Sequence, residues 1–159
     1  MIGLIIAIIL FNIIAFTTNK RLTKNQMVHI WLFTGYFQGM ADLYIDQKYH
    51  AYWYFSKGIE WSSILTITVL IPPVNMMFLN WYPFDASLLK KALYFFYWLI
   101  FMLTYEWIAL LPEPWGYFNY GWWRMWYSLI ADPFLLFIVL SYYKWICKIE
   151  NKPLQKHLQ

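Results

Sequence analysis

Apolar residues run through most of the chain in long stretches that are separated by short polar segments. A helix needs about 20 residues, or about 17 at the short end, to cross the hydrocarbon core of a bilayer. Five stretches reach this length, so the pattern predicts an all-α integral membrane protein with five transmembrane helices in a single domain. The predicted spans are 1–18, 27–46, 60–79, 92–111 and 125–143.

Three of these spans contain residues that a simple lipid-facing helix would lack. Asn12 in the first span predicts a hydrogen bond to another helix. In the third span, Pro72 and Pro73 remove two backbone donors, which predicts a kink or break near the end of that helix. The second span is marginal in hydropathy because it holds four polar side chains: His29, Gln38, Asp42 and Asp46.

Composition supports a membrane protein and argues against several other classes. The chain is 62% hydrophobic, 24% aromatic and only 13% charged, whereas soluble domains are about 25% charged. The net charge of +4 does not indicate a nucleic-acid partner, because Lys and Arg in membrane proteins report topology. Cys147 is the only cysteine, so neither an intrachain disulfide nor a paired-cysteine metal site is expected.

The basic residues predict how the helices are oriented. Nine of the twelve fall on one side of a five-span arrangement, and only Lys48, Lys57 and Arg124 fall on the other. The positive-inside rule then places the N-terminus outside the cell membrane and residues 144–159 inside, as a basic cytoplasmic tail. The first span lacks a basic leader and a small-residue cleavage site, so we expect it to be retained. The nine are Lys20, Arg21, Lys24, Lys90, Lys91, Lys144, Lys148, Lys152 and Lys156.

Aromatic residues cluster in the two loops predicted to lie outside, at 49–55 and 115–127. Rings with a polar edge favour the headgroup level, so one interpretation is a belt of interfacial anchors. The other is a lid in which both loops fold over the helices, with tight turns at Gly116 and Gly121.

Carboxylates on three different spans converge on one level of the membrane. At about 1.5 Å of rise per residue, Glu106 and Asp42 lie roughly 21 and 22 Å from the inner face, and Asp132 roughly 20 Å. Arg124, Ser128 and Asp132 follow one another at four-residue intervals and form a polar stripe on one helix face.

Further residues are predicted around this level. Gly35 and Gly39 form a GxxxG pattern, which predicts close approach of another membrane helix or of a second copy of the chain. Charges in hydrocarbon persist only with a partner or in a wet cavity, so the acids predict an outward-facing polar pocket. The candidate ligand or proton site consists of Asp42, Asp46, Glu106, Arg124, Ser128 and Asp132, and the candidate wall or lid of Glu60, Tyr105, Tyr120 and Trp122.

Three functions remain open for this pocket. The leading prediction is a unit that binds or passes protons, a cation or a small cationic ligand, with Arg124 balancing the charge. In the second, the protein is a structural or accessory subunit and the acids only fix helix packing. The third is a membrane enzyme with a protonated Glu106, although no catalytic or cofactor-binding motif is present. A metal site from Asp46, His50 and Glu60 is also open, because their spacing is not diagnostic.

Part of the sequence resembles an uncharacterised family of small, aromatic-rich multi-pass membrane proteins of spore-forming Gram-positive bacteria. The resemblance covers about residues 30–140. It implies about five spans, implies no biochemical activity, and adds weight to Glu106, Trp122 and Ser128. It is carried by NWYPF at 80–84, the Tyr105–Glu106 pair, YGWWRMWYS at 120–128, and Asp42.

Overall fold

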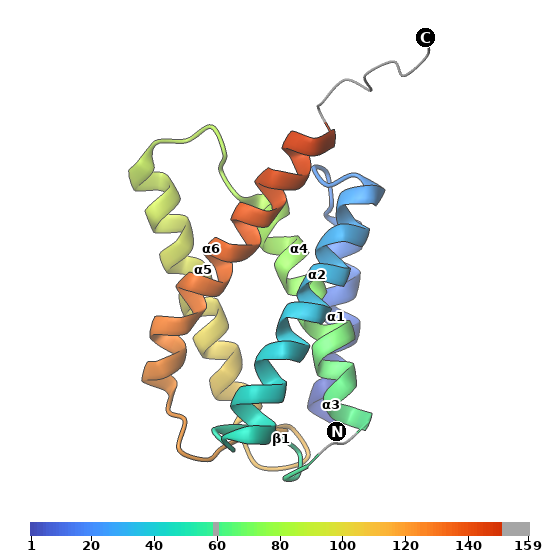
Figure 1. Cartoon of the computed structure of the whole chain (residues 1–159), viewed down its shortest axis with the longest axis vertical. Helices are drawn as coiled ribbons and strands as arrows, with labels where there is room; N and C mark the ends of the chain where they lie inside the picture. The colour runs from blue at the N-terminus through green and yellow to red at the C-terminus, as the bar shows by residue number, and fades with distance from the viewer. Residues whose placement is uncertain (59–60, 151–159) are drawn as a thin grey trace.

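The computed structural model describes residues 1–58 and 61–150, and these residues are mostly helical, as the sequence predicts. They form five long helical segments, here called passes, that run side by side (Figure 1). The passes are α1; α2 with the π-helical segment η1; α3, the π-helical segment η2 and α4 together; α5; and α6. The elements are α1 (Ile2–Thr17), α2 (Lys24–Asp42), η1 (Leu43–Lys48), β1 (Tyr52–Tyr54), α3 (Trp61–Leu65), η2 (Thr66–Leu70), α4 (Ile71–Trp81), α5 (Leu88–Ala109), β2 (Phe118–Tyr120) and α6 (Met125–Glu150).

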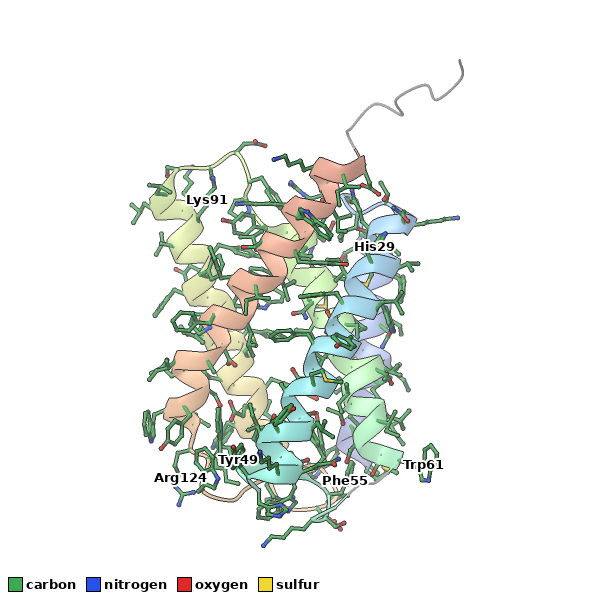
Figure 2. The ribbon with its side chains drawn as sticks, in the orientation of Figure 1. His29, Tyr49, Phe55, Trp61, Lys91 and Arg124 are labelled. Atoms are coloured by element: carbon green, nitrogen blue, oxygen red, sulfur yellow. The ribbon has the colours of Figure 1, made fainter. Side chains whose placement is uncertain are left out.

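The helices pack around α4 and α6. The α4 helix contacts both α1 and α2, while α6 crosses the bundle and contacts α2, α4 and α5. His29 and Lys91 lie at one end of the bundle, and Tyr49, Phe55, Trp61 and Arg124 lie at the other (Figure 2). We call the first the basic end and the second the capped end.

The distribution of side chains is that expected for a bundle surrounded by lipid. Isoleucine, leucine and phenylalanine side chains are exposed along α1, α5 and α6, whereas Thr34, Asp42, Thr66 and Ser128 are buried. Among the described residues, three helical stretches are long and apolar enough to cross a bilayer, judged by length and composition alone. They are Trp61–Trp81, Leu88–Ala109 and Met125–Glu150; α1 is apolar but shorter, at 16 residues.

A kink or break was predicted at the two prolines of the third pass, and the structure has a π-helical segment before them and no break. The π-helical segment η2 precedes Pro72 and Pro73, which occupy the first turn of α4, and the helix continues to Trp81. Pro73 has no N–H to offer the carbonyl of Val69, four residues earlier. That carbonyl instead accepts a hydrogen bond of 3.0 Å from Asn12 Nδ2 on α1. The interhelical bond predicted for Asn12 is therefore confirmed, and it replaces a donor that proline removes.

The two aromatic loops pair with each other at the capped end. Strands β1 and β2 are antiparallel, with Tyr52 opposite Tyr120 and Tyr54 opposite Phe118. We call residues 49–55 and 115–127 the aromatic cap. A Cβ at Gly121 would lie 2.1 Å from the His50 carbonyl oxygen, so the close approach of the two loops requires glycine there.

Each interpretation of the aromatic loops describes part of this cap. Tyr52, Tyr54 and Tyr117 are buried over the helix ends, as in a lid, whereas Trp115 and Trp122 are exposed, as in an interfacial belt.

Side-chain amides organise the basic end. Asn80 Oδ1 accepts from the backbone nitrogens of Lys20 and Arg21 at 3.0 and 3.2 Å, and its Nδ2 donates to the Thr18 carbonyl at 2.9 Å. The amides of Asn25 and Gln26 donate to Glu150 at 2.6 and 2.5 Å. These bonds lower the pKa of Glu150.

The last helix is longer than the predicted span. It extends to Glu150, seven residues beyond position 143, so the first part of the predicted tail is helical. Residues 151–159 lie outside the described part of the chain.

We expect Asn80→Leu to destabilise the protein more than Asn12→Leu. The first change removes three hydrogen bonds between Asn80 and the backbone of residues 18, 20 and 21, each worth about 0.5–1.5 kcal/mol. The second removes one interhelical hydrogen bond, worth about 1 kcal/mol. Reversible unfolding in mixed detergent micelles would measure both, and equal losses would contradict the role assigned to Asn80.

Candidate functional site

A cavity of about 300 Å³ lies inside the bundle toward the capped end. All five passes contribute to its wall, and the cap contributes Tyr52, Tyr54, Tyr117 and Trp123. Most of the lining is apolar or aromatic. Within residues 1–58 and 61–150, the wall contains two carboxylates, Glu106 and Asp132, and no lysine, arginine or histidine.

Glu106 is held by donors from the cap and from α6. Its Oε1 accepts from the Tyr120 hydroxyl at 2.5 Å and from Ser128 Oγ at 2.7 Å. The Trp123 indole nitrogen donates to Ser128 Oγ at 2.9 Å. The hydroxyl of Ser128 thus accepts from Trp123 and donates to the Glu106 carboxylate.

Asp132 lies one helical turn after Ser128 and faces the same cavity. No hydrogen bond to its carboxylate forms within the described residues. The wall thus presents one carboxylate bound by protein donors and a second without them.

Asp42 lies behind the wall of the cavity. It is 4% exposed, and its Oδ1 accepts from Tyr52 OH at 2.6 Å and from Gln38 Nε2 at 2.9 Å. Both donors line the cavity, while Asp42 itself does not. Its Oδ2 is buried without a partner in the described part of the chain. The three acids therefore gather at one end of the bundle, but only two of them share a surface.

The remaining acidic candidates of the predicted site are Asp46 and Glu60. Asp46 is buried in η1 and is not part of the wall. Glu60 lies outside the described residues. Among the residues that are described, no three His, Cys, Asp or Glu side chains are placed to hold a metal ion.

Arg124 does not balance the carboxylates as predicted. It precedes the first residue of α6, so it does not extend the stripe of Ser128 and Asp132. Its side chain is exposed and donates to the carbonyls of Gly121 and Trp123 at 3.0 and 2.8 Å. The cavity wall therefore has an uncompensated acidic character.

The structure also places the predicted wall residues Tyr105 and Trp122 and the two glycines of the GxxxG pattern. Tyr105 lines the cavity, and its hydroxyl lies 2.6 Å from that of Tyr117. Trp122 is exposed and donates to the Tyr49 carbonyl at 2.9 Å. A Cβ at Gly35 or Gly39 would meet no atom within 4 Å, so no helix of the bundle packs closely on the GxxxG pattern.

Sequence reasoning missed Tyr52 and Gln38 as site residues. Gln38 had a local signal, because a glutamine four residues before Asp42 on a helix can reach its carboxylate. The role of Tyr52 depends on the pairing of β1 with β2. That pairing brings together segments about 65 residues apart, and no local pattern indicates it.

Burial raises the pKa of the cap tyrosines. The pKa values of Tyr52 and Tyr54 are raised well above 10, first by burial and then by the charges of the nearby acids. The pKa values of Tyr117 and Tyr120 are raised for the same first reason. These phenols remain protonated, so Tyr52 and Tyr120 can donate to the carboxylates.

Comparisons of the chain with protein-family models, curated proteins and solved structures find no match. The resemblance over residues 30–140 stays a prediction, and the functional argument rests on the geometry of the cavity.

The cap tyrosines predict a loss of stability at alkaline pH. Up to pH 10 both folded and unfolded chains keep these phenols protonated. Above pH 10 the unfolded chain releases protons that the folded chain retains, so the free energy of unfolding falls by about 1.4 kcal/mol per pH unit for each retained proton. Absorbance of tyrosinate near 295 nm, with and without denaturant, would measure it. Four further tyrosinates appearing in the folded protein near pH 10 would contradict this burial.

Proposed function

We propose that the chain is a five-pass protein of the cell membrane whose cavity binds an organic cation from the outer half of the bilayer. The observation that carries this proposal is the pairing of Glu106 and Asp132 on one aromatic cavity that has no basic side chain in its described wall. Glu106 has protein donors but Asp132 has none among the described residues, and a carboxylate without a partner is costly in hydrocarbon. A bound cation would offset that cost.

The chemistry of the wall favours an organic cation over a metal ion. Phe101, Tyr105 and Trp123 line the same cavity as the acids, and aromatic faces attract ammonium groups by about 0.5–2 kcal/mol each. A metal ion instead needs several oxygen, nitrogen or sulfur ligands at fixed distances. A cavity of about 300 Å³ is also larger than a bare ion requires.

A binding site fits the cavity better than a continuous pore. Toward the basic end its wall is mostly apolar and includes Val74, Leu136 and Val139. The two polar residues there, Thr34 and Asn75, bond to each other at 3.0 Å. No charged side chain of the described wall lies on that side, so passage of protons or cations would require another conformation.

The five-pass topology is supported by where polar residues lie on the second pass. Gln26, Thr34 and Asp42 are buried, while Val28 and Leu32 are exposed. The low hydropathy of this helix therefore reflects its interior face, and its outer face suits lipid. We place the capped end outside because seven lysines and arginines of the described chain gather at the basic end: Lys20, Arg21, Lys24, Lys90, Lys91, Lys144 and Lys148.

An accessory subunit is the second candidate function. The open surface at Gly35 and Gly39 favours it, and so do the protein donors that already satisfy Glu106. Asp132 distinguishes the two candidates, because a carboxylate that only fixes packing should have a protein partner.

We expect the protein in lipid nanodiscs to bind benzyltrimethylammonium, and Glu106→Gln or Asp132→Asn to weaken binding at least tenfold. Each change removes one negative charge from the wall while preserving side-chain shape. Isothermal titration calorimetry would measure the affinity. The matched control is Glu113→Gln, which removes an exposed charge in the loop after α5 and should change the affinity less than twofold.

The result with the wild type decides between the candidates. No binding by a folded wild-type protein would refute the cation site and favour the accessory role. Equal binding by the wild type and both cavity variants would also refute the roles of Glu106 and Asp132.

The proposed topology predicts opposite labelling of two exposed positions in intact cells. In a Cys147→Ser background, Lys57→Cys at the capped end should react with a membrane-impermeant maleimide. Asp85→Cys, in the loop between α4 and α5, should react only after permeabilisation. The reverse pattern would invert the orientation, and labelling of both in intact cells would remove the third crossing.

A further inference from the structure

A second recess lies on the outer surface between α1 and α5, toward the capped end. Its volume is about 320 Å³. Ile6 and Leu10 of α1, Ile108 of α5 and Trp115 of the cap line it, and all four side chains are partly exposed on the surface that would face lipid. We call this recess the lateral groove.

Only one layer of side chains separates the lateral groove from the acidic cavity. Five residues line both spaces: Phe11, Phe101, Tyr105, Ala109 and Tyr117. The Phe11 ring packs edge-on against Phe101 and Tyr105, with centroids 5.8 and 5.1 Å apart.

The helices on either side of the partition do not pack closely on each other. The α1 helix packs mainly on α4 and η2, and α5 packs mainly on α6. Four of the five residues in the partition between groove and cavity are aromatic, and rings can move by rotamer changes without separating packed backbones.

The aromatic cap obstructs the direct route from water. Tyr52, Tyr54 and Tyr117 are buried between the cavity and the end of the bundle. The β1–β2 pairing and the hydrogen bonds of Tyr52 and Tyr120 to helix carboxylates hold the cap in place.

We propose that the occupant is a single-chain alkylammonium amphiphile that enters sideways from the bilayer, with its cationic head at Glu106 and Asp132 and its chain in the lateral groove. This inference rests on the cation site proposed above and specifies the class of its ligand. The carboxylates complement the head, and the almost wholly apolar groove complements a hydrocarbon chain. Phe11 and Tyr105 form the gate between them.

The test compares two ligands with the same head group. Benzyltrimethylammonium has no chain, whereas benzyldimethyldecylammonium carries ten carbons that the cavity cannot hold together with the head. Displacement of radiolabelled benzyltrimethylammonium from protein in nanodiscs would be measured, with empty nanodiscs correcting for lipid partition. We expect the decyl compound to displace the label completely.

Two variants test whether the hydrocarbon chain of the ligand lies in the lateral groove. Ile108→Trp fills the groove, and Ile100→Trp places the same ring on α5 outside it; the native isoleucines are 43% and 46% exposed. We expect Ile108→Trp to weaken displacement by the decyl compound at least tenfold while benzyltrimethylammonium binding stays within twofold. Ile100→Trp should change neither.

The outcomes separate the two proposals. If benzyltrimethylammonium binds and the decyl compound fails to displace it, or if Ile108→Trp has no more effect than Ile100→Trp, the lateral route is wrong and the cation site stands. If benzyltrimethylammonium itself does not bind the wild type, the cation site fails and the lateral inference fails with it.

Discussion

Two phenol–carboxylate hydrogen bonds hold the capped end of the bundle together. Tyr52 and Tyr120 lie opposite each other across the two-stranded sheet. Tyr52 donates to Asp42 on α2, and Tyr120 donates to Glu106 on α5. The sheet thus connects two helices that are not neighbours in sequence. Each acid accepts from one phenol and from one helix side chain, Gln38 for Asp42 and Ser128 for Glu106, and each phenol is positioned by the sheet.

The cavity follows from this arrangement. Tyr52 and Tyr117 extend from the cap over the space between the helices, while Gln38, Glu106 and Asp132 face it from α2, α5 and α6. The π-helical segments contribute Ile45, Thr66 and Leu70 to the same wall. π-Helical turns are rare and occur frequently at functional sites. Their position here agrees with the cavity being the functional centre of the molecule.

Local patterns predicted the parts of this structure that depend on neighbouring residues. The helical passes follow from long apolar stretches, and the shared level of Glu106 and Asp132 follows from helical rise alone. The displacement of Asp42 behind Tyr52 and Gln38 could not be predicted, since it depends on how β1 lies against α2. The prediction that Arg124 shares a helix face with Ser128 and Asp132 required the helix to include Arg124, whereas α6 begins one residue later. That the helix continues past Pro72 and Pro73 could not be predicted either, because it depends on η2 and on Asn12, a residue about 60 positions away.

The sequence separation between β1 and β2 has a consequence for biogenesis. Strands of three residues are too short to be stable alone, and these two are separated by α3, η2, α4 and α5. The cap can therefore form only after those helices have been made and have returned the chain to the capped end of the bundle. Its closure would seal the cavity as one of the last steps of assembly, so a chain with an incomplete set of helices would keep its acids open to water and be recognisable to quality control.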